Sequence, residues 1–173
     1  MPPPLSFDPI AEARRNWESH WGGEAVPSMG AVTSIMRAHQ VLLARLNELL
    51  EPWELTFPRY EALMLLLYSR AGELPLGKMG ERLQVHRASV TNVVDRLVHQ
   101  GFIERIPQEN DRRSVLARIT PEGRRVARAA TKRLNEERFG MDPLGDPACE
   151  GLFEALTPLR EGAGDFVPVP RAP

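Results

Sequence analysis

The chain has 173 residues, enough for one domain of ordinary size, and its content of 42% hydrophobic and 26% charged residues is typical of a globular protein. No stretch approaches the ~20 apolar residues of a membrane-spanning helix, and the amino terminus does not resemble a secretory signal. Cys149 is the only cysteine, which excludes a disulfide framework and a cysteine-rich zinc site and favours a reducing, cytoplasmic setting.

The charge is distributed unevenly along the chain. The net charge is −1, but residues 78–133 hold 13 Lys or Arg against 6 Asp or Glu, a balance of +7. The remainder has 9 basic and 17 acidic residues, a balance of −8. A basic section in a nearly neutral chain indicates a polyanion partner, although solvated arginines would give the same count.

Two helices are predicted in the first part of the chain, after a proline-rich start at 1–7 that is expected to be flexible. The first covers 8–21, because Asp8 is a good capping residue and the proline that follows it suits the first helical position. The second covers 29–50, where apolar residues occupy more than one stripe, so that several neighbours should bury it.

Three further helices follow in quick succession. The first begins at Thr56, a good capping residue, and runs to about Arg70. The second is short and covers 76–83. A tight turn at 84–86 leads to the third, which ends at Gly101, because glycine commonly follows the last turn of a helix.

The hydrophobic pattern then changes its period. Residues 102–107 and 114–120 read as strands, and the polar QENDRR between them predicts a β-hairpin. A helix over 120–138 starts with a capping hydroxyl, a proline and an acid. A last helix starts at Asp146, and 162–173 are expected to form a flexible tail.

The order of these segments predicts a mainly α protein with a small β-hairpin. A short helix, a tight turn, a second helix and a two-stranded hairpin together form a winged helix-turn-helix, here over 56–120. In this motif the second helix enters the major groove of DNA, and the residues at its amino-terminal end contact the edges of bases.

The helix that would enter the groove has two unlike faces. Apolar residues recur at i, i+3, i+4 and i+7, so one side should fix the helix to the body of the domain. The opposite side carries hydrogen-bonding groups. The apolar stripe consists of Val90, Val93, Val94 and Leu97.

The polar face supplies the candidate base contacts. Arg87 can donate two hydrogen bonds to guanine, and Asn92 can pair with the edge of adenine. Ser89 and Thr91 are short enough to reach a base or a phosphate, and Arg96 is expected to contact a phosphate. Simple solvation is the alternative for each of these side chains.

The tip of the hairpin supplies a second candidate contact. Arg112 and Arg113 can enter the minor groove, where the potential is most negative. Asp111 stands two residues before Arg113 and could hold its guanidinium group by a hydrogen bond. An ordinary charged turn is the alternative.

The segment 76–126 resembles the MarR family of bacterial transcription regulators, and the likeness extends over roughly 29–160. It is most specific at SVTNVVDRL, GFIERI, NDRRS and ITPEG, in this order and spacing. The aspartate and arginine of the family's wing match Asp111 and Arg113. His86 stands where the family usually has a capping serine or threonine, so that either the cap is weaker or His86 itself contacts DNA.

The resemblance implies a homodimer that binds double-stranded DNA at a pseudo-palindromic operator. It predicts one domain over 8–161, in which 8–55 and 121–161 are mainly dimerisation helices beside the winged helix-turn-helix. A small anionic or aromatic metabolite would release the DNA, which makes the expected function that of a ligand-responsive repressor.

The additional amino-terminal helix resembles the subgroup with urate-responsive and aconitate-responsive regulators. Trp17 matches the tryptophan of the urate pocket, although packing of its own helix would equally explain it. Glu61 stands where that pocket has an aspartate, and Val93 replaces a ligand-binding arginine, which favours another carboxylate over urate. Cationic candidates for binding such a ligand are Arg14, Arg15, His20 and Arg37.

Other functions find less support in the sequence. Cys149 lies in the first turn of the last predicted helix, so a redox-responsive DNA-binding regulator is the alternative function. The histidines show no H-E-x-x-H spacing, and no G-x-S-x-G or phosphate-binding loop is present. We therefore expect no catalysis, cofactor or metal site, and no membrane partner.

Overall fold

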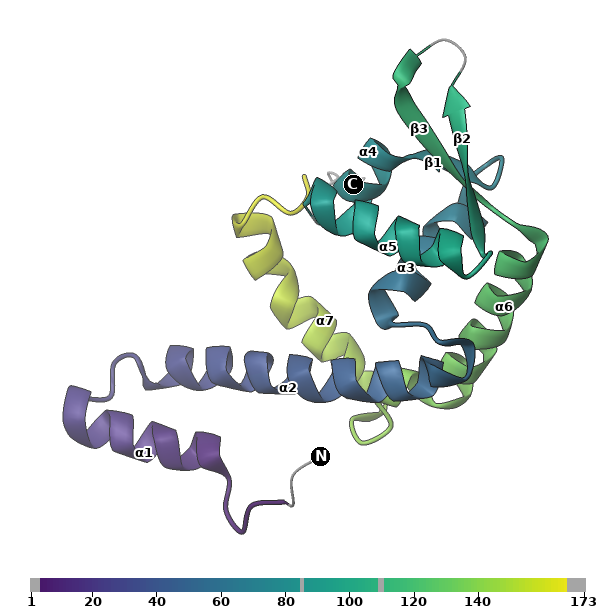
Figure 1. The fold of residues 1–173 in the computed structure, drawn as a ribbon. Helices are drawn as coiled ribbons and strands as arrows, with labels where there is room; N and C mark the ends of the chain where they lie inside the picture. Colours follow the sequence, from purple (N-terminus) through teal and green to yellow (C-terminus); the bar gives the residue numbers. More distant parts are fainter. Residues whose placement is uncertain (1–3, 85, 109–110, 168–173) are drawn as a thin grey trace, which may run out of the picture. The chain divides into compact units, whose positions relative to one another are not determined.

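The computed structural model describes residues 4–84, 86–108 and 111–167 (Figure 1). The chain divides into two compact units, 1–45 and 46–173. The predicted order of helices is confirmed. The elements are α1 (Pro9–Trp21), α2 (Val26–Leu50), η1 (Glu51–Trp53), α3 (Phe57–Tyr68), β1 (Glu73–Pro75), α4 (Leu76–Leu83), α5 (Arg87–His99), β2 (Ile103–Gln108), β3 (Asp111–Ile119), α6 (Pro121–Glu136), η2 (Arg138–Gly140) and α7 (Gly145–Gly162).

The first unit contains α1 and most of α2. The predicted cap of α1 is confirmed, because Asp8 Oδ1 accepts a hydrogen bond of 2.9 Å from the amide of Ile10. α2 begins at Val26, three residues before the prediction. A Cβ atom at Gly30 would lie 2.9 Å from Arg14 Cδ, so the arginine stem of α1 packs closely on the backbone of α2.

The second unit contains the hydrophobic core. α3 contacts α4, α5 and α6, and α4 also contacts α5, so that α3 lies at the centre of the helices. The valine stripe of α5 faces this core, except that Val93 is only partly buried. The largest fully buried side chains are Leu50, Leu63, Leu66, Met79, Val90, Val94, Leu97, Val126 and Leu134.

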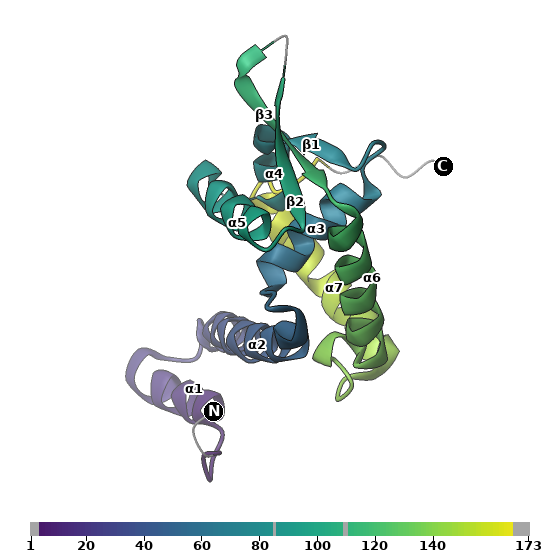
Figure 2. The same ribbon diagram turned by 45° about the vertical axis from the view of Figure 1, so that its right-hand side comes forward.

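A three-stranded antiparallel sheet replaces the expected two-stranded hairpin. β1 pairs with β3, which lies in the centre of the order β1-β3-β2. Arg118 of β3 joins the outer strands, because its guanidinium lies 2.7 Å from Glu73 and 3.7 Å from Glu104. β2 and β3 project beyond α4 and α5 in both views (Figures 1 and 2). β3 begins at Asp111, so the turn is shorter than the predicted QENDRR loop.

The cap predicted for α3 is wrong. Thr56 is the residue before the helix, but its hydroxyl group caps no amide and instead accepts a hydrogen bond of 3.1 Å from Arg59 Nε. The amide of Phe57 is capped by Asn47 Oδ1 at 2.8 Å. The start of α3 therefore depends on the last turns of α2, and the helix ends at Tyr68 rather than near Arg70.

The start of α6 requires a glycine. As predicted, Thr120 Oγ1 caps the helix by accepting a hydrogen bond of 3.0 Å from the amide of Gly123. The amide of Thr120 donates to the carbonyl of Phe102 at 3.0 Å, which brings the connection between α5 and β2 against the first turn of α6. A Cβ atom at Gly123 would overlap the Phe102 carbonyl oxygen and lie 2.9 Å from its carbon.

The last helix leaves its apolar residues exposed in the single chain. α7 begins at Gly145, one residue before the predicted start, and has no buried residue. The exposed fractions are 40% for Leu152, 62% for Phe153 and 63% for Leu159. No helix in the described ranges is long and apolar enough to cross a membrane.

Candidate nucleic-acid interface

His86 caps α5, the helix expected to enter the major groove. Its Nδ1 atom accepts a hydrogen bond of 3.3 Å from the amide of Ala88, and its backbone is extended, as in an ordinary capping residue. Nδ1 must be unprotonated to accept this bond. The histidine therefore supplies the cap that serine or threonine would otherwise supply.

The predicted polar face of α5 is exposed along its length. Ser89, Thr91, Asn92 and Arg96 are exposed, while the buried side of the helix faces the core. The structure thus brings together four of the five base- or phosphate-contacting residues predicted on this helix. The side chain of Arg87 lies outside the described part of the structure, and its contact stays a prediction.

The backbone of the wing is described up to its tip. Asp111, Arg112 and Arg113 form the first residues of β3, but their side chains lie outside the described part, as do residues 109–110. The hydrogen bond expected between Asp111 and Arg113 stays a prediction.

An ion pair connects α5 to the wing. Arg105 Nη2 on β2 lies 2.7 Å from Asp95 Oδ1 on α5. Both side chains are partly exposed, so the pair contributes to orientation more than to stability. This contact was not predicted, and its only signal in the sequence is a pair of opposite charges on consecutive elements.

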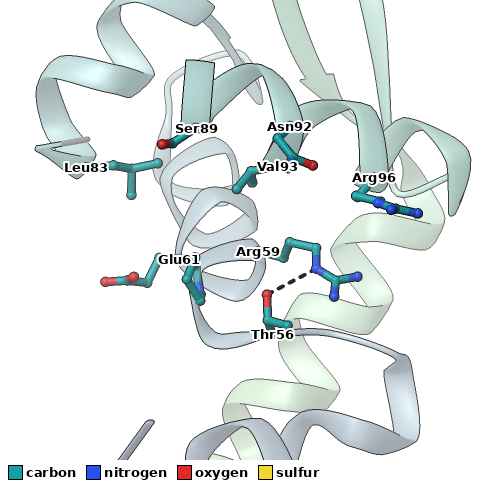
Figure 3. A pocket seen from close by; sticks show the side chains of 9 residues that line it. Thr56, Arg59, Glu61, Leu83, Ser89, Asn92, Val93 and Arg96 are labelled. Atoms are coloured by element: carbon teal, nitrogen blue, oxygen red, sulfur yellow. Dashed lines mark hydrogen bonds between the residues drawn. The ribbon is translucent and has the colours of Figure 1, made fainter. Parts of the chain in front are cut away.

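A pocket lies beside the polar face of α5, between that helix and the start of α3 (Figure 3). Its volume of about 510 Å³ lies within the range of small-molecule sites. Three of the predicted DNA-contacting residues belong to its wall. The lining residues are Thr56, Pro58, Arg59, Glu61, Leu83, Ser89, Asn92, Val93 and Arg96.

The charges in the pocket suit an anion. Arg59 bonds to three neutral oxygens, those of Thr56, Glu54 and Gln100, and to no carboxylate in the described ranges. Arg96 has no side-chain partner among the residues described. Among the described residues of the wall, Glu61 is the only acid, and partial desolvation of this exposed side chain raises the pKa of its carboxyl group and disfavours its charged form.

The predicted ligand residues divide between the two units. Trp17, His20 and Arg14 belong to α1, and Arg37 belongs to α2; only Glu61 lines the pocket. His20 Nδ1 lies 2.8 Å from the carbonyl oxygen of Asn16 in its own helix. Because the units are described separately, this ligand set stays a prediction. Arg59 was not predicted, although it stands in the first turn of α3.

No metal site is visible in the described part of the chain, where no three His, Cys, Asp or Glu side chains gather. Cys149 is partly buried on α7. Nearby, Arg138 forms an ion pair with Asp146, which ties η2 to the first turn of α7.

Comparison with known proteins identifies the family. The family model described as MarR family matches residues 55–115, which include the helix-turn-helix and part of the wing. The solved structure of Sco5413, a MarR family transcriptional regulator from Streptomyces coelicolor, has a TM-score of 0.77 and 50% sequence identity. That match covers 83% of this chain and 99% of Sco5413. The chain belongs to the MarR family.

Two other relatives agree with this MarR fold. The multiple antibiotic resistance protein MarR of Salmonella typhimurium is 30% identical over 92 residues, 53% of this chain and 62% of the relative. The chain thus spans less than two thirds of that curated relative. A MarR variant from E. coli, crystallised with operator DNA, covers 79% of this chain and 97% of its own, with a TM-score of 0.68. Because the two sequences are only 22% identical, this match shows a similar fold and nothing more.

Family membership confirms the winged helix-turn-helix prediction. Sco5413 is named as a regulator of transcription and not as an enzyme. This chain is accordingly a MarR-family transcriptional regulator. The likeness to the urate-responsive and aconitate-responsive subgroup stays a prediction.

Proposed function

We propose that this MarR-family regulator binds double-stranded DNA as a homodimer and represses transcription until a small carboxylate metabolite releases it. The observation that carries the proposal is the exposed polar face of α5 beside a projecting wing, in a chain of this family. A cytoplasmic location is part of the same proposal, because the DNA partner is there.

The roles of individual residues follow from their chemistry. Asn92 would read adenine, Arg87 would read guanine, and Arg96 would contact a phosphate. Ser89 and Thr91 would contact a base or a phosphate. On the wing, Arg112 and Arg113 would enter the minor groove, with Asp111 orienting the second arginine.

The exposed apolar residues of α7 support the dimer. Contiguous apolar surface on a single chain commonly marks a protein interface. Leu152, Phe153 and Leu159 give such a surface, and a second copy of the chain would cover it. Dimer symmetry would then place two copies of α5 on successive half-sites of an inverted repeat.

The pocket supports a carboxylate effector. Arg59 and Arg96 contribute two cations to its lining, and Pro58, Leu83 and Val93 contribute apolar surface. The contribution of Trp17, His20, Arg14 and Arg37 to this effector site belongs to the same proposal. A ligand seated here would contact Asn92 and Arg96, which are also proposed to contact DNA.

Gel-shift titration against the promoter upstream of the regulator's own gene tests DNA binding. We expect Asn92→Ala to cost about 1–3 kcal/mol and to relax the sequence preference, and Arg113→Ala to weaken binding to all sequences. Arg125→Ala is the matched control, since Arg125 is exposed on α6 and pairs with Glu122. A folded dimer that binds no upstream fragment at moderate salt would exclude the proposal.

The same assay separates the two signals considered for this regulator. Organic carboxylates should release DNA from the wild type and from Cys149→Ser alike. Release by peroxide that disappears in Cys149→Ser would instead establish the redox alternative and remove the carboxylate effector.

A further inference from the structure

Arg59 connects three parts of the DNA-binding lobe. It lies in the first turn of α3, and its Nε donates to Thr56 Oγ1 at 3.1 Å (Figure 3). Its Nη1 donates to the carbonyl oxygen of Glu54 at 2.8 Å and to Gln100 Oε1 at 3.4 Å. Arg59 therefore joins α3, its own helix, to the connection before it and to the residue that follows α5.

Gln100 closes this arrangement at the carboxyl-terminal end of α5. Its side-chain Nε2 donates to the same Glu54 carbonyl at 3.0 Å, while its backbone amide donates to the carbonyl of Arg96 at 3.0 Å. The Glu54 carbonyl thus accepts from both Arg59 and Gln100. We call these three residues the α5 clamp.

The acceptor of the clamp is held firmly by the backbone. Glu54 has a left-handed conformation with φ of 52°, and the next residue, Leu55, is only 3% exposed. The amide of Leu55 donates to the carbonyl of Leu50 at 3.3 Å. The Glu54 carbonyl therefore stays in place when one of its partners moves. Loss of Arg59 from the clamp would loosen the end of α5, and the connection before α3 would keep its conformation.

Arg59 is also part of the pocket wall. Its acceptors in the clamp are neutral, whereas a carboxylate accepts two charge-assisted hydrogen bonds from a guanidinium group, each roughly twice as strong as a neutral bond. Nη1 carries the bonds to both Glu54 and Gln100, so an anion that engages this edge of the guanidinium group would compete with them for the same donor.

We infer that Arg59 is the positioning residue through which a bound carboxylate releases the end of α5 from the clamp. The inference rests on the proposed function, because it gives the class of effector and the route by which the pocket acts on DNA binding. The volume of the pocket and the apolar part of its lining suit a carboxylate attached to a single ring. Neutral molecules of the same shape would leave Arg59 in the clamp.

Benzoate and its neutral analogue benzamide test the inference on the full-length protein. Binding is measured by calorimetry, and operator affinity by fluorescence anisotropy with and without each compound. We expect benzoate to bind the wild type and to release DNA at millimolar concentration, and we expect benzamide to do neither.

Three variants separate the two roles of Arg59. Arg59→Gln should weaken benzoate binding by about ten-fold or more, since it removes the charge. It should also weaken operator binding without ligand, because the clamp is lost, and abolish any further release by benzoate. Arg59→Lys keeps the charge but cannot form the bidentate pair of hydrogen bonds, so it should retain part of the benzoate affinity. Gln100→Ala should weaken operator binding by roughly three- to ten-fold without ligand, the loss of one or two hydrogen bonds, and should not lower benzoate affinity, because it removes one competitor for the Arg59 donor.

The controls show whether a negative result counts against the proposed function or against the clamp. Arg125→Gln removes an exposed arginine of α6 and should behave as the wild type in every measurement. Thermal melts establish that each variant is folded. Wild-type protein that binds no operator would overturn the proposed function itself. If the wild type does bind the operator, three results would each overturn the inference about the clamp alone. These are unaltered release by benzoate from Arg59→Gln, unaltered operator affinity of Gln100→Ala, and no binding of benzoate to the wild type.

Discussion

Replacement of Gly123 by alanine should destabilise the regulator, although the same change usually stabilises a helix. In a helix interior alanine is favoured over glycine by about 0.5–1 kcal/mol. At Gly123 the new Cβ atom would overlap the Phe102 carbonyl oxygen, which is backbone and cannot rotate away. Overpacking of this kind typically costs about 1–3 kcal/mol. Separation of the loop from α6 would also stretch the bond from Thr120 to Phe102, worth about 1 kcal/mol.

The net effect of Gly123→Ala is therefore a loss of roughly 2 kcal/mol, which corresponds to a fall in Tm of about 4–8 °C for a chain of this size. Thermal unfolding followed by circular dichroism measures it at fixed protein concentration. Gly77→Ala is the matched control, because no atom lies within 4 Å of a Cβ at this exposed position on α4, and a small rise in Tm is expected. A Gly123→Ala protein that melts at or above the wild type would refute the reasoning.

Three other substitutions test single interactions by the same melts. Asn47→Ala should cost about 1–2 kcal/mol because it uncaps α3, and Thr56→Ala should cost less; the reverse order would show that Thr56 is the cap after all. Tyr60→Phe should cost about 1 kcal/mol, since the buried Tyr60 hydroxyl loses its 3.0 Å hydrogen bond to Thr131, and an unchanged Tm would count against that bond. Partial desolvation raises the pKa of Glu61, although its side chain is exposed, so its charged form lowers stability as pH rises above the ordinary carboxyl range. Because solvent screens an exposed group, Glu61→Gln should raise Tm only slightly at neutral pH, with a gain that disappears in acid. A gain independent of pH would exclude this cause.

The order of elements could be predicted because its signals are local. The caps at Asp8 and Thr120 act on amides two and three residues away, and the valine stripe of α5 repeats within one helix. The strand β1 could not be found in this way. It has three residues and owes its conformation to pairing with β3, more than 40 residues later in the chain, and not to a pattern of its own.

The site could be predicted only in part for the same reason. The exposed face of α5 follows from helical periodicity alone. The partners of Arg59 do not, because Gln100 lies 41 residues away and the contact exists only after α3 has packed against α5. Asn47 caps α3 in place of Thr56 because of the way the end of α2 approaches α3. The types of these two residues do not specify that approach.

The composition of the pocket wall limits how the proposed effector of this regulator could be exchanged for another. On α5, Asn92 and Arg96 belong both to the pocket and to the face proposed for DNA, so an exchange there would alter operator choice together with chemical preference. On α3, Pro58 and Glu61 line the same cavity without belonging to that face. Anyone building a biosensor from this scaffold should therefore diversify the α3 positions first and keep the reporter promoter unchanged.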